Sequence, residues 1–394
     1  MKSIEDIQLN GRRVLIRVDF NVPLKNGQVT DATRIRSSLA TVRYAIDQGA
    51  RVILASHLGR PDGKVKPELS LGPVAQELAA ELDKAVALLP DCVGPLVEQH
   101  VRAMRNGDVA LLENLRFHAE EEANEPAFAK ALASLCDVYV NDAFGTAHRA
   151  HASTAGIVDY VSEAGAGFLL MAEVKALTGL LKNPARPFVA VVGGAKVSDK
   201  IALMSSLLER CDSLIVGGAM AYTFLRAQGV EVGISRVEED KIPLATALLA
   251  EAARRGVSVA LPVDHVVARE FQENAPVHDT EGTAIESGWM GLDIGPRTRA
   301  AYCGLLAKAA TGFWNGPMGV FEWKSCAAGT TAVANAVADS KAISVVGGGD
   351  SVAALVQTGR AADITHISTG GGASLELLEG KILPGVAALE AKAG

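Results

Sequence analysis

Short apolar runs alternate with longer amphipathic segments along the whole chain. In the first half, the runs "RVLIRV", "RVILAS", "AVALL", "VALLE" and "DVYVN" predict strands at residues 13–18, 51–56, 85–89, 109–113 and 137–141. Apolar residues at helical spacing predict intervening helices at 33–48, 72–83 and 126–135. Gly49 suits the position that follows the first of these helices, because glycine adopts a positive φ at little cost.

The second half repeats this alternation. It predicts strands at residues 188–192, 213–217, 257–261, 311–315, 343–347 and 364–368. The strand runs are continuously apolar, which is typical of parallel strands that helices cover on both faces. We therefore predict an α/β fold of two doubly wound parallel-sheet (Rossmann-like) domains joined by an interdomain helix.

A helical segment, "GFLLMAEVKALTGLLK", ends before Pro184 and Pro187 and marks the predicted boundary. It divides the chain into an N-terminal domain at 1–167, an interdomain helix or hinge at 168–183 and a C-terminal domain at 184–379. Two domains suit a chain of 394 residues, because single cores stop growing at roughly 250–300 residues.

The bulk composition narrows the class of protein. Hydrophobic residues make up 49% and charged residues 21%, as in ordinary globular chains, and the net charge of −7 argues against a general nucleic-acid surface. The five cysteines form no Cys-x-x-Cys pair, so we expect neither a structural zinc site nor a disulfide framework. Without a signal-peptide core or an apolar run near ~20 residues, we expect a soluble cytoplasmic protein without a membrane partner.

Glycines cluster after the predicted strands of the second half, where ligands bind in open parallel sheets. They are Gly193-Gly194, Gly217-Gly218, Gly316, Gly347-Gly348-Gly349 and Gly370-Gly371-Gly372. A single pair indicates no more than a tight turn. The repeated clusters indicate a crevice where the backbone approaches a flat or phosphorylated ligand.

The segment "VAVVGGAKVSDK" joins a strand to a glycine pair and two lysines. It matches neither a Walker A loop nor Gly-x-Gly-x-x-Gly. A helix that begins behind the glycines would place Lys196 and Lys200 one turn apart and favour phosphate binding, although exposed i,i+4 ion pairs are the alternative. Asp350, after the triple glycine, suits either a Mg²⁺ held mainly by nucleotide phosphates or a helix N-cap, and both roles could coexist.

Basic residues follow the predicted strands of the first half instead: His57, Arg60, Arg116 and Arg149, with Arg34 in "DATRIR". A parallel sheet would gather the first four at one rim, as a site for a small, highly charged anion. Taken singly, each arginine suits a solvated surface. Asp19 and Asn21 in "RVDFNVP" would hold a substrate hydroxyl or make an Asx turn before Pro23.

Eight motifs together resemble the phosphoglycerate kinase family, in order and over nearly the whole chain. They are "RVDFNVPL", "SHLGRP", "LLENLRF", "NDAFGTAHRAHAST", "GGAKVSDK", "WNGPMGVFE", "GGGDS" and "STGGGAS". The long motifs "NDAFGTAHRAH" and "WNGPMGVFE" are the most specific. Thr311-Gly312-Phe313 is less aliphatic than this resemblance leads one to expect, which affects packing rather than the proposed contacts.

The resemblance implies reversible phosphoryl transfer between 1,3-bisphosphoglycerate and ADP, giving 3-phosphoglycerate and ATP in glycolysis or gluconeogenesis. It implies a triose site on the N-terminal domain, Mg²⁺ with ATP or ADP on the C-terminal domain, and direct in-line transfer on hinge closure. It further implies a monomer whose segment 380–394 returns to the N-terminal domain.

By the same resemblance, Asp19 and Asn21 contact the glycerate hydroxyl and carboxylate, and Arg34 lies beside the reacting carboxyl. The residues implied for the 3-phosphate are His57, Arg60, Arg116 and Arg149. Lys196 reaches the transferring phosphoryl and Lys200 the nucleotide phosphates. The other implied nucleotide-binding residues are Gly193, Gly194, Gly217, Gly218, Gly291, Asn315, Glu322, Gly348, Gly349, Asp350 and Ser351. Among these, Gly217, Gly218 and Gly291 border adenine, Glu322 takes the ribose, and Asp350 is the metal ligand.

A carboxylate acceptor has an ordinary pKa of roughly 3.5–4 and is already ionised, so the reaction requires no general base. His148 and His151 therefore read as structural residues. Two rival classes share parts of this pattern. A Rossmann dehydrogenase lacks its Gly-x-Gly-x-x-Gly here. A non-enzymatic two-lobed binding protein would bind 3-phosphoglycerate without turning over ATP.

Overall fold

The computed structural model describes residues 1–393, which form two compact units. The first contains Met1–Lys175 and the chain from Ile382 onward, and the second contains Ala176–Lys381. The division falls within helix α6, Phe168–Lys182.

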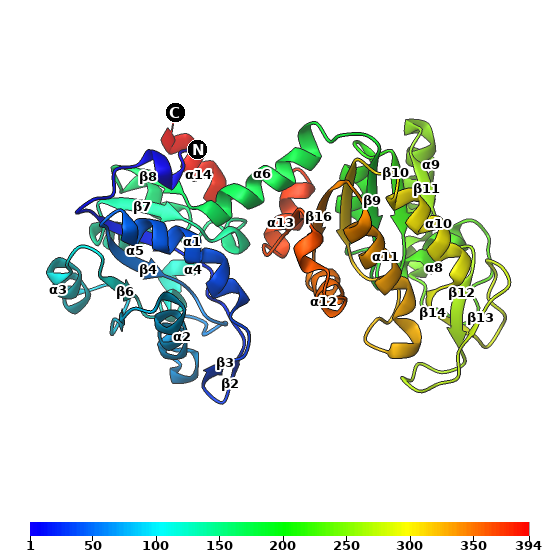
Figure 1. The fold of residues 1–394 in the computed structure, drawn as a ribbon, viewed down its shortest axis with the longest axis horizontal. Coiled ribbons are helices and arrows are strands. Elements are labelled where there is room, and N and C mark those ends of the chain that lie inside the picture. Colours follow the sequence, from blue (N-terminus) through cyan, green and yellow to red (C-terminus); the bar gives the residue numbers. More distant parts are fainter. Residues whose placement is uncertain (394) are drawn as a thin grey trace. The chain divides into compact units, whose positions relative to one another are not determined.

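The first unit is built on a six-stranded parallel sheet in the order β5-β6-β4-β1-β7-β8 (Figure 1). Its strands are β1 Arg13–Arg17, β4 Arg51–Ala55, β5 Val86–Leu88, β6 Val109–Leu111, β7 Val138–Asn141 and β8 Ala164–Ala166. Its helices besides α6 are α1 Thr33–Asp47, α2 Gly72–Leu82, α3 Pro95–Ala103, α4 Ala119–Glu122, α5 Pro126–Ser134 and α14 Pro384–Ala393. An antiparallel hairpin joins β2 Leu24–Lys25 to β3 Gln28–Val29.

The C-terminal helix α14 packs in this first unit, against β8 and the short helix η5 (Gly156–Asp159). The Gly385 N–H donates to the Ala147 carbonyl at 2.9 Å. The other 3₁₀ turns of the unit are η1 Ile4–Asp6, η2 Pro67–Leu69, η3 Leu115–Phe117 and η4 Phe144–Thr146.

The second unit also has a six-stranded parallel sheet, in the order β11-β10-β9-β15-β16-β17. Its strands are β9 Phe188–Val192, β10 Ser213–Val216, β11 Ser258–Ala260, β15 Thr311–Asn315, β16 Ile343–Gly347 and β17 His366–Ile367. Its helices are α7 Ile201–Leu208, α8 Met220–Ala227, α9 Ile242–Arg255, α10 Pro296–Leu306, α11 Ala328–Asp339, α12 Gly349–Gln357 and α13 Gly372–Leu378, with 3₁₀ turns η6 Glu239–Lys241, η7 Lys324–Cys326 and η8 Ala361–Asp363.

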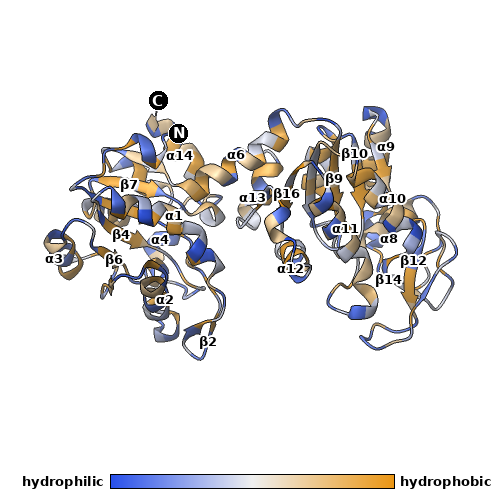
Figure 2. Ribbon diagram, viewed as in Figure 1, coloured by the Kyte–Doolittle hydropathy of each residue, from blue (hydrophilic) through white to orange (hydrophobic). Residues whose placement is uncertain are grey.

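Each six-stranded sheet lies at the centre of its own hydrophobic core, and its central strands are coloured mainly as hydrophobic in Figure 2. In the first unit, Val14 of β1 pairs with Val52 of β4 and Val138 of β7, and all three are buried. In the second, all five residues of β15 are buried, including Trp314. The two six-stranded parallel sheets confirm the predicted α/β class.

Besides the β2–β3 hairpin, two sheet features were not predicted. A three-stranded antiparallel sheet, in the order β13-β12-β14, joins β12 His265–Ala268, β13 His278–Asp279 and β14 Met290–Ile294 in the second unit. Strand β8 is Ala-Gly-Ala, and β13 is an exposed His-Asp pair, so neither carries the β-branched apolar signal of a strand.

Within residues 1–393, none of the helices combines the length and hydropathy of a membrane span.

Candidate active site

A basic cluster in the first unit follows four strands that are neighbours in the sheet, β6, β4, β1 and β7. Asp19 follows β1, His57 follows β4, Arg116 lies in η3 after β6, and Arg149 lies after β7. Because the carboxyl ends of parallel strands meet at one edge, the sheet order gathers these side chains at a single rim.

Asp19 and Arg34 form an ion pair at this rim. The Arg34 Nη1 donates to Asp19 Oδ2 at 2.6 Å, and Asp19 is buried. The other oxygen, Oδ1, accepts the Asn21 N–H at 3.3 Å, so the Asx turn is present as well. Asn21 Oδ1 accepts the Gly59 N–H at 2.9 Å. Asp19 therefore makes the turn and orients Arg34 at the same time.

His57 is buried beside three arginines. Arg17 Nη2 lies 3.3 Å from His57 Nδ1, and Asp19 Oδ1 lies 4.0 Å from the same nitrogen. Burial, followed by the positive charges of Arg17, Arg116 and other neighbours, lowers the pKa of His57 well below its ordinary value. The imidazole is therefore neutral at physiological pH.

Arg116 is the most buried of the predicted phosphate arginines. Its Nη1 donates to the Gly59 carbonyl at 3.0 Å, and its Nε lies 3.4 Å from Glu122 Oε1. Burial lowers the pKa of Arg116, and the positive charges of Arg17 and Arg149 act in the same direction. Such mutual repulsion is relieved when an anion binds between the cations.

The remaining predicted residues of this rim are exposed. Arg60 follows Gly59, and Arg149 follows the turn after β7. The Arg149 charge contributes to the lowered pKa values of Arg116 and His151, which places it near both. No contact ties the Arg60 side chain to the cluster among the described residues.

A buried network beneath the rim was not predicted. Arg17 Nε donates to Ser153 Oγ at 2.8 Å, and Ser153 Oγ donates to Glu121 Oε1 at 2.5 Å. The Ser153 N–H also donates to Glu121 Oε2 at 2.9 Å. All three residues are buried, and Glu121 balances the charge of Arg17 from inside the unit. The sequence feature that indicates this network is Arg17, a charged residue inside the apolar run "RVLIRV".

His151 lies at the edge of this network, with Nδ1 3.9 Å from Glu121 Oε1. Burial, reinforced by the charges of Arg116, Arg17 and Arg149, lowers the pKa of His151 to about 4. A neutral His151 in a buried position fits the predicted structural role.

The second unit contains a cavity of about 510 Å³ beyond its parallel strands. Five of the predicted nucleotide residues line it: Gly194, Gly218, Gly291, Glu322 and Asp350. Apolar side chains form much of the remaining wall, among them Ile234, Phe271, Met290, Leu292 and Val320. A largely apolar cavity whose lining includes two carboxylates suits a purine ring with polar substituents. Tyr222 and Arg236 also line it and were not predicted.

The loop of Lys196 and Lys200 differs from the sequence-based expectation. Helix α7 begins at Ile201, so residues 193–200 are a non-helical loop, and the expected helical spacing of the two lysines is wrong. The alternative of i,i+4 pairs on a helix is wrong for the same reason. Lys196 is exposed, whereas Lys200 Nζ donates to Asn315 Oδ1 and burial lowers the pKa of Lys200.

Glu238 fastens this loop and was not predicted. Its Oε2 accepts the Val197 N–H at 2.5 Å and the Ser198 N–H at 3.2 Å, while its Oε1 accepts from Ser198 Oγ at 2.6 Å. Glu238 lies just before η6, about forty residues further along the chain, so spacing within the motif could not reveal it. The carboxylate holds the backbone between Lys196 and Lys200.

The glycines of the second unit divide into two groups. A Cβ at Gly193 would lie 2.1 Å from the Pro317 carbonyl oxygen, and one at Gly218 would lie 2.5 Å from the Gly194 oxygen. Gly217 similarly faces Met318. These glycines let neighbouring loops pack together. By contrast, a Cβ at Gly349 would meet no atom within 4 Å, so this position is open to a ligand.

The predicted phosphate-binding residues Gly348, Gly349 and Asp350 lie at the start of α12. The N-cap is Gly348, with Gly349 as the first helical residue, so the alternative of Asp350 as N-cap is wrong. Asn315 Nδ2 donates to the Gly347 carbonyl at 2.8 Å, and the buried Ser351 Oγ accepts the Gly316 N–H at 2.5 Å. These two side chains hold the loops in place around the helix N-terminus.

Asp350 fits a magnesium role. It is exposed, lines the cavity and lies in the first turn of α12 beside unpaired backbone N–H groups. A single carboxylate suits Mg²⁺, which keeps several waters and is bound mainly through nucleotide phosphates.

Known proteins resemble the chain over its whole length. The sequence model of the family described as phosphoglycerate kinase matches residues 4–381. Phosphoglycerate kinase from Moorella thermoacetica is 59% identical over 390 residues, covering 99% of both chains. The enzyme from Koribacter versatilis is 56% identical over 399 residues, also covering 99% of both.

Solved structures of the same family also resemble the chain. Phosphoglycerate kinase from Coxiella burnetii superposes with a TM-score of 0.93 at 47% identity, covering 100% of this chain and 99% of the other. Phosphoglycerate kinase from Pyrococcus horikoshii gives a TM-score of 0.86 at 34% identity with the same coverage. The dehydrogenase and the non-enzymatic binding protein are thereby excluded. The chain belongs to the phosphoglycerate kinase family, glycolytic phosphotransferases that move a phosphoryl group reversibly between 1,3-bisphosphoglycerate and ADP, giving 3-phosphoglycerate and ATP.

Proposed function

We propose that the first unit binds the triose at its basic rim, that the second binds Mg-nucleotide in its cavity, and that the phosphoryl group passes directly between them. The observation that carries this proposal is the complementary chemistry of the two sites. One rim concentrates guanidinium groups around a neutral His57, and the other unit offers an apolar cavity that ends at a helix N-terminus.

In the first unit, Arg116, Arg60 and Arg149 bind the distal 3-phosphate, with His57 Nε2 as an additional neutral donor. Asp19 orients Arg34 toward the reacting carboxyl through their 2.6 Å ion pair. Asn21 and Asp19 contact the glycerate end of the ligand. One guanidinium group binds a phosphate or a carboxylate with two parallel hydrogen bonds, which fixes the orientation of the anion as well as neutralising its charge.

In the second unit, the apolar wall takes adenine, and Glu322 at the cavity edge takes the ribose hydroxyls. Gly349 and the N-terminus of α12 receive the nucleotide phosphates, together with Lys200. Lys196 reaches the phosphoryl group in transfer. Magnesium, held by Asp350, supplies positive charge that offsets the negative phosphates.

The chemistry requires alignment and fixed charge rather than proton transfer. The acceptor carboxylate is already ionised at neutral pH, so no residue has to act as general base. Arg34 and Lys196 stabilise charge on the transferring group, a role that is typically worth 10²–10³ in rate, or about 3–4 kcal/mol. We propose that α6 acts as the hinge and that closure excludes water, the competing acceptor. We further propose a cytoplasmic monomer.

The decisive experiment is a coupled assay with 3-phosphoglycerate and Mg-ATP on the full chain and on Lys196→Ala. We expect robust turnover of the parent and a loss of kcat of ~10²–10³ in the variant. Lys308→Ala, an exposed lysine at the end of α10, is the matched control and should keep its rate. Undiminished turnover in Lys196→Ala would show that the role belongs to another residue.

The hinge is tested separately by small-angle X-ray scattering. The radius of gyration should fall when 3-phosphoglycerate and a non-hydrolysable nucleotide are both present, and remain nearly constant with either alone. An unchanged radius of gyration with both ligands bound would refute closure about α6, and the assignment of the reaction would be unaffected.

A further inference from the structure

Asp91, Cys92 and His118 form a compact group of potential metal ligands in the first unit, outside the residues assigned to the kinase reaction. Asp91 and Cys92 lie between β5 and α3, and His118 lies between η3 and α4. One ligand atom from each residue lies within 4.8 Å of the other two. Within residues 1–393, this is the one such group of three or more His, Cys, Asp or Glu side chains.

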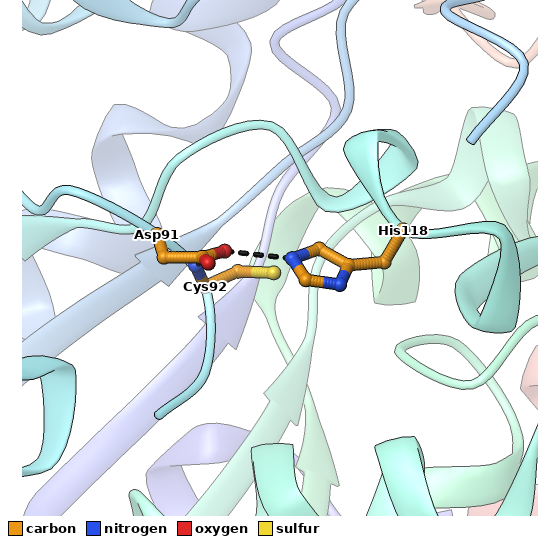
Figure 3. A group of neighbouring side chains, drawn as sticks. All are labelled: Asp91, Cys92 and His118. Carbon is orange, nitrogen blue, oxygen red and sulfur yellow. Dashed lines mark hydrogen bonds and ion pairs between the residues drawn. The ribbon is translucent and has the colours of Figure 1, made fainter. Parts of the chain in front are cut away.

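The group is held in place from several directions. His118 Nε2 lies 2.7 Å from Asp91 Oδ1, and the same oxygen accepts the Cys92 N–H at 2.7 Å. The His118 ring packs on Phe128 with centroids 5.2 Å apart. As Figure 3 shows, the Cys92 sulfur and the Asp91 carboxylate point toward the same edge of the imidazole ring.

The three side chains differ in their exposure to solvent. Cys92 is fully buried, whereas the His118 and Asp91 side chains are 28% and 48% exposed. A ligand could therefore reach the nitrogen and oxygen from solvent while the sulfur closes the site from within. The group of three side chains is therefore held by protein contacts and is open to solvent on one side.

A Cys-His-Asp arrangement also resembles the machinery of a thiol nucleophile, but this one does not fit that chemistry. A reactive cysteine is partly exposed and has a lowered thiol pKa. Cys92 is fully buried, and burial raises the pKa of its thiol well above the ordinary value. A hydrogen-bonded Asp91–His118 pair by itself would account for those two residues and leave the sulfur without a role.

A mixed set of thiolate, imidazole and carboxylate ligands is the donor set of Zn²⁺ and related divalent metals. We propose that Asp91, Cys92 and His118 bind one such cation through Oδ1, Sγ and Nε2, with water as the fourth ligand. Zinc bonds of about 2.0–2.3 Å place neighbouring ligands roughly 3.3–3.6 Å apart, so the 2.7 Å contact opens slightly on binding. The Cys92 proton passes to solvent, and the imidazole proton resides on Nδ1.

No Cys-x-x-Cys pair marks this group in the sequence. The ligands come from two loops, twenty-six residues apart, and only the sheet order β5-β6 brings those loops together. The proposed site does not depend on the kinase activity.

Cobalt(II) provides the test, because it replaces zinc in such sites and gives a visible signature. The full chain, free of nucleotide and Mg²⁺, is titrated with Co²⁺ and then with Zn²⁺. We expect one equivalent to produce a sulfur-to-cobalt charge-transfer band and the strong visible bands of four-coordinate cobalt, both abolished by Zn²⁺. Cys92→Ser should lose the charge-transfer band, and His118→Gln should weaken binding at least tenfold.

Cys136→Ser is the matched control, since Cys136 is also buried in the first unit but belongs to no group of three or more potential ligands among the described residues. It should bind cobalt as the parent does. Should Cys92→Ser fail to fold, His118→Gln and Asp91→Asn decide by the same titration. No charge-transfer band in the parent, an unchanged band in Cys92→Ser, or undiminished affinity in both His118→Gln and Asp91→Asn would each overturn the proposal.

Discussion

Arg17 Nη2 lies 3.3 Å from His57 Nδ1, and both side chains are buried. A guanidinium has donors and no acceptor, so in this contact the nitrogen of the imidazole accepts. Because His57 is neutral, its single proton must then reside on Nε2. Arg17 therefore determines which nitrogen of His57 donates to an anionic ligand, although the arginine itself lies inside strand β1.

The first prediction is that His57 remains neutral, with its proton on Nε2, through pH 6. Nitrogen–proton correlation spectra of the imidazoles, with the His57 signals assigned by His57→Gln, would measure this. The native pKa is lowered below the unfolded value of about 6.5, so the unfolded chain binds more protons as the pH falls below that value. This residue's contribution to stability is complete above about pH 6.5 and declines below it. A titration midpoint near 6.5, or a proton on Nδ1, would contradict the tautomer assignment.

A second prediction concerns Glu238, which anchors the loop of Lys196. Glu238→Ala removes three charge-assisted hydrogen bonds and should loosen the loop. We expect kcat/KM for Mg-ATP to fall roughly tenfold, equivalent to about 1.4 kcal/mol, with KM for 3-phosphoglycerate little changed. Steady-state kinetics measure both constants.

The matched control is Glu239→Ala, because Glu239 is the exposed neighbour and is not bonded to this loop. Glu238→Gln keeps one acceptor oxygen and should lie between the parent and Glu238→Ala. Equal kinetics for Glu238→Ala and Glu239→Ala would mean that the loop is held by other contacts.

A third prediction separates ligand-facing from packing glycines. Gly349→Ala adds a methyl group in open space at the start of a helix, so folding stability should be unchanged or raised by up to about 1 kcal/mol. ADP affinity, measured by calorimetry, should fall at least several-fold because the methyl group occupies the proposed phosphate approach. Gly218→Ala instead strains a φ of 70° and brings its Cβ within 2.5 Å of Gly194 oxygen.

Gly218→Ala should therefore lower the melting temperature as well as ADP affinity. If Gly349→Ala bound ADP as tightly as the parent, the phosphates would have to lie elsewhere than at the N-terminus of α12.

A fourth prediction rests on Asp142, which is buried and accepts the Leu169 and Leu170 N–H groups at 2.9 and 3.2 Å. Burial raises the pKa of Asp142 to about 7. Between the ordinary pKa of about 3.9 and pH 7, the native protein holds a proton that the unfolded chain has released, so stability falls as the pH rises through this range. Above about pH 7 this dependence ends.

Asp142→Asn keeps an oxygen for the two amides and removes the titration. Its free energy of unfolding relative to the parent, measured by urea denaturation, should therefore increase between pH 5 and pH 8, by a few kcal/mol at most, since one pKa unit corresponds to about 1.4 kcal/mol. Burial also raises the pKa of Asp293 in the second unit to about 7. Asp293 is present in both the parent and the variant, so its contribution cancels when the two are compared. Parallel pH profiles for parent and variant would show that Asp142 is ionised throughout.

Much of the fold was predictable because buried parallel strands are continuous apolar runs. Strands β9, β15 and β16 begin and end at the predicted residues, and the others of that kind differ by one or a few. Strands β8 and β13 were missed because small or charged residues do not identify a strand, and β12 and β14 were missed because their apolar residues form only short runs. The start of α7 was misplaced because Glu238, far along the chain, holds residues 197 and 198 in a loop.

The alternation of strands and helices, the two α/β units and the kinds of side chain that follow each strand can be read from the amino-acid pattern, because they depend on residues close together in the chain. The adjacency of β6, β4, β1 and β7, and therefore the gathering of Asp19, His57, Arg116 and Arg149 at one rim, depends on the packed sheet. Tertiary packing also pairs Arg17 with Ser153 across 136 residues of chain and makes His57 neutral. Strand order and burial arise from long-range packing, and they set the distances and the dielectric surroundings on which binding and protonation depend.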